Sequence, residues 1–420
     1  MTNSQIIENR IDHLFRHESG KMISVIARII GYDKVDEAED IVQDTLLKAM
    51  QTWSIKGVPD NPEAWLYSVA KNKAIDEIRK NKNKVKYESE VSCLLYTDMS
   101  LIPTIDKMFL DNEIEDSQLR MIFACCHPSM AIEYQIALVL KILAGFSSKE
   151  ISRALLTNEE TTNKRIYRAK KKLAEKNKEL SVPIGEQAEE RIHSVNRVIY
   201  LIFNEGYNAT TGDRILREDL CFEALRLAEL LTTNQRFRND YTTSLLALIK
   251  CHLSRNKARF DSENNLVTLD KQDRRLWDRE MMESAFIDMQ KVKIRTTNKY
   301  FLEASISATH CVGPSIEKTD WAMIVSLYDS LYRLEQSPYI LLNKFIAISY
   351  YKSIGEAITL MKGITELENY YLFHSTLSHL YKRDGNVEMA IKSLEKAVTL
   401  TENKQEIEHL RGKIEKLKKQ

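Results

Sequence analysis

Short polar and basic side chains gather at residues 145–173, GFSSKEISRALLTNEETTNKRIYRAKKKL, where they could bind nucleic acid. At 3.6 residues per turn, the second half of this stretch predicts a helix with a polar outer face. The polar and basic residues of that face are Thr161, Lys164, Arg165, Arg168, Lys170, Lys171 and Lys172. Short polar side chains can reach base edges, and arginine or lysine can hold phosphates. The alternative is a solvated, lysine-rich helix without a ligand.

Two short helices and a turn must position this face. Ser147 or Ser148 can cap a first helix that carries Ile151 and Leu155. A turn near Thr157 then leads into the basic helix. This arrangement is typical of a helix-turn-helix, and the capped first helix favours DNA binding over the solvated alternative.

A second candidate surface is acidic and lies on a helix predicted over residues 33–53. Its core-facing side is predicted from the apolar residues Ile41, Val42, Leu46, Ala49 and Met50. The exposed side of its first half is predicted from Glu37, Glu39, Asp40, Gln43 and Asp44. This face either stabilises the helix dipole in solvent or docks a basic or polar protein partner.

A third candidate surface combines a tryptophan with basic residues on a helix predicted from Pro62, with Asn61 as its cap. Trp65 lies opposite the apolar stripe of this helix. It shares the charged side with Asn72, Lys73, Arg79 and Lys80. An exposed ring can stack on unpaired bases, so the pattern indicates opened rather than intact duplex. Packing of Trp65 against a neighbouring helix is the alternative.

The remaining chemistry-bearing residues give little support for an enzyme. No nucleophile–base spacing, phosphate loop or metal set accompanies the polar cluster of Asp270, Asp273, Arg274 and Asp278, which favours ion pairs between helices. The six cysteines lack CxxC spacing, and CCHPS at 125–129 favours a packed helix end before Pro128 over a zinc site. We expect no catalytic residue, no metal and no cofactor.

The bulk composition predicts an all-α protein of two or three domains. The chain has 420 residues but only 12 glycines and 7 prolines. Its net charge of +1 confines any electrostatic function to local patches. No apolar run approaches the roughly 18–20 residues that span a bilayer, and the first residues do not form a signal peptide. We therefore expect a cytoplasmic protein with no membrane partner.

Breaks in the helical pattern predict the domain boundaries. Residues 1–88 form a first domain of four helices, 89–113 a linker, 114–178 a helix-turn-helix domain, and 188–420 a large helical domain. In the last domain Gly385, Ala390, Leu394 and Ala397 have tetratricopeptide (TPR) spacing, which predicts stacked helical hairpins.

The order of these surfaces resembles a bacterial sigma-70 family factor. AEDIVQDTLLKA followed by WLYSVAKNKAIDEIRK resembles region 2, and GFSSKEISRALL with RIYRAKKKL resembles region 4. The lack of region 3 material between them points to the extracytoplasmic-function (ECF) group. YLIFNEGYNATTG, DLCFEALRLAELL and LDKQDRRLWDRE resemble the TPR-like C-terminal extension of one subgroup.

The resemblance implies a non-enzymatic factor that binds core RNA polymerase, through the β′ clamp helices and the β subunit, and promoter DNA. The positions that match β′ docking are Asp40, Gln43 and Asp44. Those that match −10 recognition and melting are Trp65, Tyr67, Asn72, Lys73 and Arg79, and we add Lys80 from the same face. Those that match −35 reading are Thr161, Asn163, Lys164, Arg165 and Arg168. We expect the domain at 188–420 to modulate activity or bind a protein or peptide partner.

Two positions depart from the family pattern. Leu155–Leu156–Thr157 fill the turn where many members have glycine, and Thr162 takes a position that is usually apolar. Two other functions stay open: a helix-turn-helix regulator that does not act as a sigma subunit, and a helical protein-interaction scaffold.

Overall fold

The computed structural model describes residues 3–81, 98–175, 186–208, 214–261, 267–401 and 404–419. Within these ranges the regular structure is helical, with 3₁₀ turns between α-helices and no strand, so the predicted all-α fold is confirmed. No helix in the described ranges is both long and apolar enough to cross a bilayer. The chain divides into two compact units, Met1–Arg238 and Asn239–Gln420.

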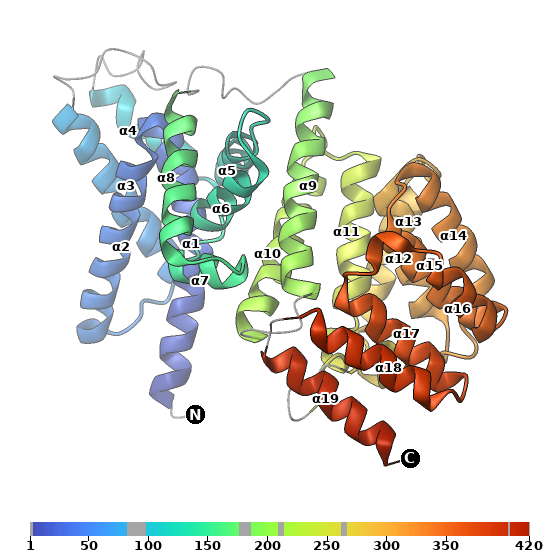
Figure 1. Ribbon diagram of the computed structural model, residues 1–420. Coiled ribbons are helices and arrows are strands. Elements are labelled where there is room, and N and C mark those ends of the chain that lie inside the picture. The colour runs from blue at the N-terminus through green and yellow to red at the C-terminus, as the bar shows by residue number, and fades with distance from the viewer. Residues whose placement is uncertain are drawn as a thin grey trace. The chain divides into compact units, whose positions relative to one another are not determined.

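Three long helices, drawn in blue in Figure 1, begin the first unit and pack on one another. They are α1 (Asn3–Ile30), α2 (Val35–Lys56) and α3 (Pro62–Asn81). Gly31, with φ of 111°, ends α1, and the 3₁₀ turn η1 (Tyr32–Lys34) leads into α2. Asn61 caps α3, because its Oδ1 accepts a hydrogen bond from the Ala64 N–H at 3.0 Å. The described part of the first predicted domain thus holds three α-helices and a 3₁₀ turn instead of four helices.

Helix α4 (Asp98–Met108) lies inside the range predicted as a linker, 89–113. Ile105 and Met108 are one turn apart and pack in a buried cluster with Val25, Ile29 and Ile75. These apolar side chains order the second half of the predicted linker as part of the first unit. The first part of that range lies outside the described residues.

Four helices form the second part of the first unit: α5 (Asp111–Cys125), α6 (Ile132–Ile142), α7 (Ser148–Ala154) and α8 (Glu159–Glu175). Ser147 and Glu150 form a capping box at the start of α7, which confirms the predicted N-terminus. Cys125 and Cys126 are fully buried where α5 ends, as expected for a packed helix end.

Helices α9 (Glu186–Asn208) and α10 (Arg214–Thr233) belong to the first compact unit, although they follow the domain boundary predicted at residue 188. Arg191 on α9 donates a hydrogen bond to the main-chain oxygen of Phe123. The Phe123 ring lies 4.7 Å from the Phe237 ring, centroid to centroid. These contacts with α5 explain why the segment from α9 to Phe237 packs as part of the first compact unit.

The second unit is a series of helices, each packed mainly on its neighbours in sequence. They are α11 (Asp240–Leu253), α12 (Arg279–Lys291), α13 (Lys299–Val312), α14 (Trp321–Leu334), α15 (Pro338–Tyr351), α16 (Ile354–Lys362), α17 (Tyr371–Arg383), α18 (Val387–Thr399) and α19 (Lys404–Lys418). Such nearest-neighbour packing is characteristic of helical repeat folds.

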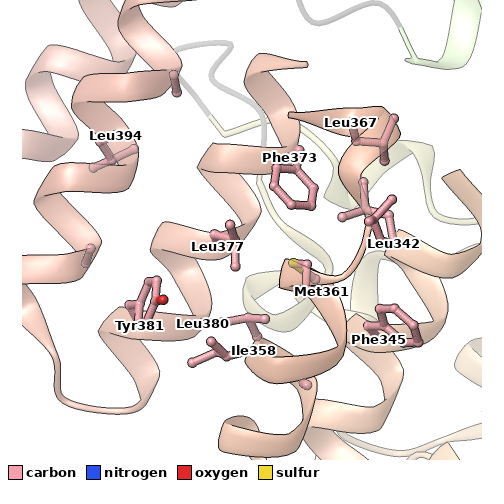
Figure 2. Packing of buried hydrophobic residues seen from close by; sticks show 14 of the residues in the cluster. Leu342, Phe345, Ile358, Met361, Leu367, Phe373, Leu377, Leu380, Tyr381 and Leu394 are labelled. Carbon is pink, nitrogen blue, oxygen red and sulfur yellow. The ribbon is translucent and has the colours of Figure 1, made fainter. Parts of the chain in front are cut away.

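The predicted TPR-spaced residues lie in the hairpin of α17 and α18. Gly385 has φ of 81° in the turn, and Ala390, Leu394 and Ala397 are buried. The three buried residues belong to the hydrophobic cluster of which Figure 2 shows a part, where side chains such as Phe345, Met361 and Phe373 converge from α15, α16 and α17. The small alanines let α18 approach its neighbours closely.

Candidate nucleic-acid interface

The acidic residues predicted to dock a partner lie on the exposed side of α2. Asp40, Gln43 and Asp44 are all exposed. Asp40 and Asp44 line a shallow groove of about 430 Å³ between α2 and α3. Lys73 of α3 pairs with Asp44 at 3.0 Å across this groove. The acidic surface and the basic surface of α3 therefore meet along one edge.

The second half of α2 exposes apolar side chains, which the sequence reasoning missed. Leu47, Met50 and Ile55 are 55%, 58% and 85% exposed. Met50 was expected in the core, but the buried row runs through Thr45, Ala49 and Trp53 instead. The i, i+4 spacing of those three residues could have predicted this buried row from the sequence. Exposed apolar side chains beside acidic ones are typical of a protein-docking surface.

Trp65 is half-buried. It is therefore neither a fully exposed ring nor a fully packed one, which were the two alternatives considered from the sequence. Its ring makes an edge-to-face contact with Trp53, at 5.5 Å between centroids and 61° between planes. Trp53 is buried and lies 5.6 Å from the Phe15 ring. Trp65 is thus the outer member of an aromatic stack and keeps part of its surface toward solvent.

The other −10 candidates divide between two faces of α3. Asn72, Arg79 and Lys80 are exposed and Lys73 is half-buried, on the side of Trp65. Tyr67 instead packs toward the cluster of α1 and α4, and its hydroxyl donates to Glu18. Burial, followed by the bond to Glu18, raises the pKa of Tyr67. We therefore assign Tyr67 to the packing of the domain, because its side chain lies on a different face of α3 from that of Trp65.

Helix α8 presents the predicted −35 residues on its outer side. Asn163, Lys164 and Arg168 are exposed, and Thr161 and Arg165 are partly so. Asn158 caps the helix, with its Oδ1 accepting from the Thr161 N–H at 2.7 Å. Tyr167, which the sequence reasoning passed over, is 70% exposed on the same helix. Its position directly before Arg168 on a basic helix could have identified Tyr167 as a candidate for the DNA-binding surface.

The two departures from the family pattern have structural explanations. Leu156 has φ of 48° and so adopts the left-handed conformation that glycine would adopt without strain. Its side chain is 78% exposed and gains little from packing. Thr162 is fully buried, and its hydroxyl shares a hydrogen bond of 2.9 Å with the Thr157 hydroxyl. This bond satisfies the polar atom that stands in an apolar position.

Ion pairs connect α8 with the start of α2. Lys170 pairs with Asp36 and with the buried carboxylate of Glu39, which the sequence had placed on the exposed side. Burial lowers the pKa of Lys170, but the two carboxylates outweigh burial and raise it above the ordinary value. Lys141 of α6 adds a contact of 3.8 Å to Glu39. The basic helix is therefore held against α2 by a partly desolvated cluster of charges.

A second junction joins α1 to the segments around α7 and α10. Arg16 pairs with Glu150 at 2.7 Å and also with Asp219, and its guanidinium lies 5.0 Å from the Phe146 ring centroid. Close main-chain packing accompanies it, because a Cβ on Gly20 would lie 2.1 Å from the Leu143 carbonyl oxygen. Only glycine permits α1 to approach the end of α6 this closely.

The polar cluster at 270–278 does not form one site. Asp273 pairs with Arg275 at 2.8 Å in an exposed position, and Asp278 caps α12 through the Met281 N–H. Arg274 donates to the main-chain oxygens of His310 and Gly313. These groups act in capping and loop closure, whereas ion pairs between helices were expected.

Family models match three parts of the chain. They are Sigma-70 region 2 over residues 14–84, Sigma-70 region 4 over 120–173, and a family of unknown function (DUF6596) over 191–293. The last match spans α9, α10 and the start of the second unit.

Individual relatives agree with these matches. Uncharacterized protein R00370 of Rhizobium meliloti (strain 1021) is 33% identical over 390 residues, which are 92% of this chain and 91% of that protein. The ECF RNA polymerase sigma factor SigL of Mycobacterium tuberculosis (strain ATCC 25618 / H37Rv) is 29% identical over 147 residues, 35% of this chain and 77% of its own. The ECF RNA polymerase sigma factor SigW of Bacillus subtilis (strain 168) is 27% identical over 169 residues, 38% of this chain and 84% of its own. The chain therefore belongs to the extracytoplasmic-function group of the sigma-70 family, with a helical extension after region 4.

Proposed function

We propose that this chain binds core RNA polymerase through the acidic and apolar face of α2, opens promoter DNA with α3 and reads the −35 element with α8. The observation that carries this proposal is the presence of all three exposed surfaces on one compact unit. A regulator that does not replace the sigma subunit needs only the last of them. Nucleotide chemistry is left to the polymerase.

Run-off transcription with core polymerase and a promoter tests this function. The wild-type chain is expected to give transcripts, and Asp40→Ala is expected to weaken polymerase binding because it removes an exposed charge from the docking face. Lys171→Ala, on the exposed surface of α8, is the matched control for polymerase binding. Duplex binding without transcripts would favour the regulator, and neither activity would favour the scaffold.

We also infer that the polymerase-free chain holds regions 2 and 4 together and must release them to act. The −10 and −35 elements are about 25 base pairs apart, which is roughly 85 Å at 3.4 Å per base pair. Lys170 nevertheless touches Asp36 and Glu39, and Gly20 lies against Leu143. One chain cannot keep these contacts and occupy both elements. Helices α9 and α10, which add Asp219 to the Arg16 junction, would then modulate activity by favouring the closed form.

Gly20→Ala tests this inference, because the added Cβ would clash with main chain and favour separation of the two regions. Gly355→Ala is the matched control, since its Cβ would meet nothing within 4 Å. We expect a larger radius of gyration in solution scattering and several-fold tighter binding to core polymerase for Gly20→Ala alone. Unchanged scattering and affinity in a folded Gly20→Ala protein would refute the closed form.

A further inference from the structure

Two cysteines of the second unit meet where α11 and α13 both end. Cys251 is fully buried in the last turn of α11, and Cys311 is 6% exposed in the last turn of α13. The Sγ of Cys311 lies 3.7 Å from the main-chain oxygen of Cys251. The Ser254 hydroxyl lies 4.0 Å from the same Sγ. Cys251 and Cys311 are therefore neighbours where the two helices end, which is the arrangement that a disulfide bond requires.

Two guanidinium groups make the surroundings of Cys311 electropositive. Arg255 is buried and donates to Ser307 at 3.3 Å, while Arg274 donates to the main-chain oxygens beside Cys311. Hydrogen bonding to Cys251, together with the charges of Arg255 and Arg274, outweighs the effect of burial and lowers the pKa of Cys311 to about 7. The bond to Cys311, followed by burial, raises the pKa of Cys251. One thiol is thus poised as a thiolate, and its neighbour stays protonated.

The neighbouring histidines do not supply this charge or complete a metal site. Burial, then Arg255, lowers the pKa values of both His252 and His310, so both rings are neutral at pH 7. No group of three or more His, Cys, Asp or Glu side chains placed to hold a metal ion occurs in the described part of the chain.

The adjacent pair Cys125 and Cys126 provides a contrast within the same protein. Both are fully buried where α5 ends, and burial raises both pKa values. Neither has the thiolate character that oxidation requires. Arg191 lowers the pKa of Cys126 but does not outweigh burial. At Cys311 the hydrogen bond to Cys251 and the two arginines together do outweigh it.

We propose that Cys251 and Cys311 form a reversible disulfide when the protein meets a small peroxide. The Cys311 thiolate attacks one oxygen of hydrogen peroxide, the O–O bond breaks, and hydroxide leaves with a proton as water. The Cys251 thiol then attacks the sulfur of the sulfenic acid, and the second oxygen leaves as water. Two thiols lose two electrons in total, and one peroxide becomes two waters. A dithiol reductant reverses the reaction by thiol–disulfide exchange.

The test uses the full chain with Cys93→Ser, which removes the cysteine outside the described residues. The protein is treated with hydrogen peroxide at pH 7, alkylated after denaturation and mapped by mass spectrometry. We expect one cross-linked peptide pair that joins Cys251 to Cys311 and disappears with dithiothreitol, while Cys125 and Cys126 remain alkylated. Cys251→Ser is expected to stop at a sulfenic acid that dimedone traps on Cys311.

Arg274→Gln separates the electrostatic cause from simple proximity. Removing one of two cations is expected to slow disulfide formation about threefold to tenfold at pH 7, because each unit of pKa changes the thiolate fraction up to tenfold. Arg274→Lys, which keeps the charge, should recover most of the rate, and a thermal melt checks that each variant folds. The proposal is overturned if both thiols remain alkylatable after excess peroxide. It is also overturned if Cys251 reacts equally fast in Cys311→Ser.

Discussion

Replacement of Trp65 distinguishes packing from DNA contact, because in the proposed mechanism its ring both packs on Trp53 and stacks on an unpaired base. The edge-to-face contact with Trp53 is worth about 0.5–1.5 kcal/mol beyond its buried area. Stacking of the exposed part on an unpaired base is worth about 1–3 kcal/mol. Since 1.4 kcal/mol is a factor of ten, loss of that stacking is expected to lower open-complex formation about fivefold to 150-fold.

Three variants separate these contributions. Trp65→Phe keeps an aromatic ring against Trp53 and should retain most activity. Trp65→Leu keeps apolar packing but has no ring to stack on a base. Trp65→Ala loses both, with a stability cost of about 1–3 kcal/mol, less than for a fully buried tryptophan.

The assay compares transcription from an intact duplex with transcription from a template that is already melted over the −10 element. Trp65→Leu and Trp65→Ala should lose most activity on the duplex and regain much of it on the melted template, with polymerase binding unchanged. An equal loss on both templates would refute the reasoning and leave Trp65 as a packing residue. Equal activity of Trp65→Leu and wild type on duplex would refute it as well.

Three further predictions concern stability. Leu156→Gly should raise the melting temperature by relieving the left-handed strain, a net gain of about 0.5–1 kcal/mol after the entropy of glycine, whereas Leu156→Ala should show no gain. Thr162→Val should lower the free energy of unfolding by about 1 kcal/mol or less through loss of the bond to Thr157, and a loss above 2 kcal/mol in thermal or urea unfolding would contradict this account. Burial, followed by Arg255 and Arg274, lowers the pKa of His310 from 6.5 to about 3. The stability that depends on the neutral His310 ring is therefore present above pH 6.5 and is lost as the pH falls toward 3. At pH 5 the loss should be about 1–2 kcal/mol, and His310→Gln should flatten the melting temperature against pH.

Helix positions and caps were predictable because they depend on neighbours in sequence. The Ser147 cap, the Asn61 cap and the Gly31 break all follow from local residue types, and the structure confirms them. Met50 was misplaced because an apolar residue beside the core stripe can face either way, and only the neighbouring helices decide which.

Side-chain partners far apart in sequence were not predictable. Glu39 looked like an exposed acid, yet Lys170 and Lys141 bury it. Tyr67 matched a DNA-contacting position, yet its hydroxyl binds Glu18 on another helix. The residue pattern of α2 or α3 alone cannot predict these partners, because they lie on segments that come together only when the chain folds.

The sequence alone determined the helical fold, the order of the candidate polymerase and DNA surfaces and the family of this protein. These properties reside in periodicity, capping and motif order, which are local. Tertiary structure decided that Trp65 is shared between a packed stack and solvent, that Leu156 carries backbone strain, and that α9 and α10 belong to the first unit. It also brought Cys251 and Cys311 together with two arginines. Proximity of this kind depends on how helices pack, and packing energy is gained only once the whole unit has folded.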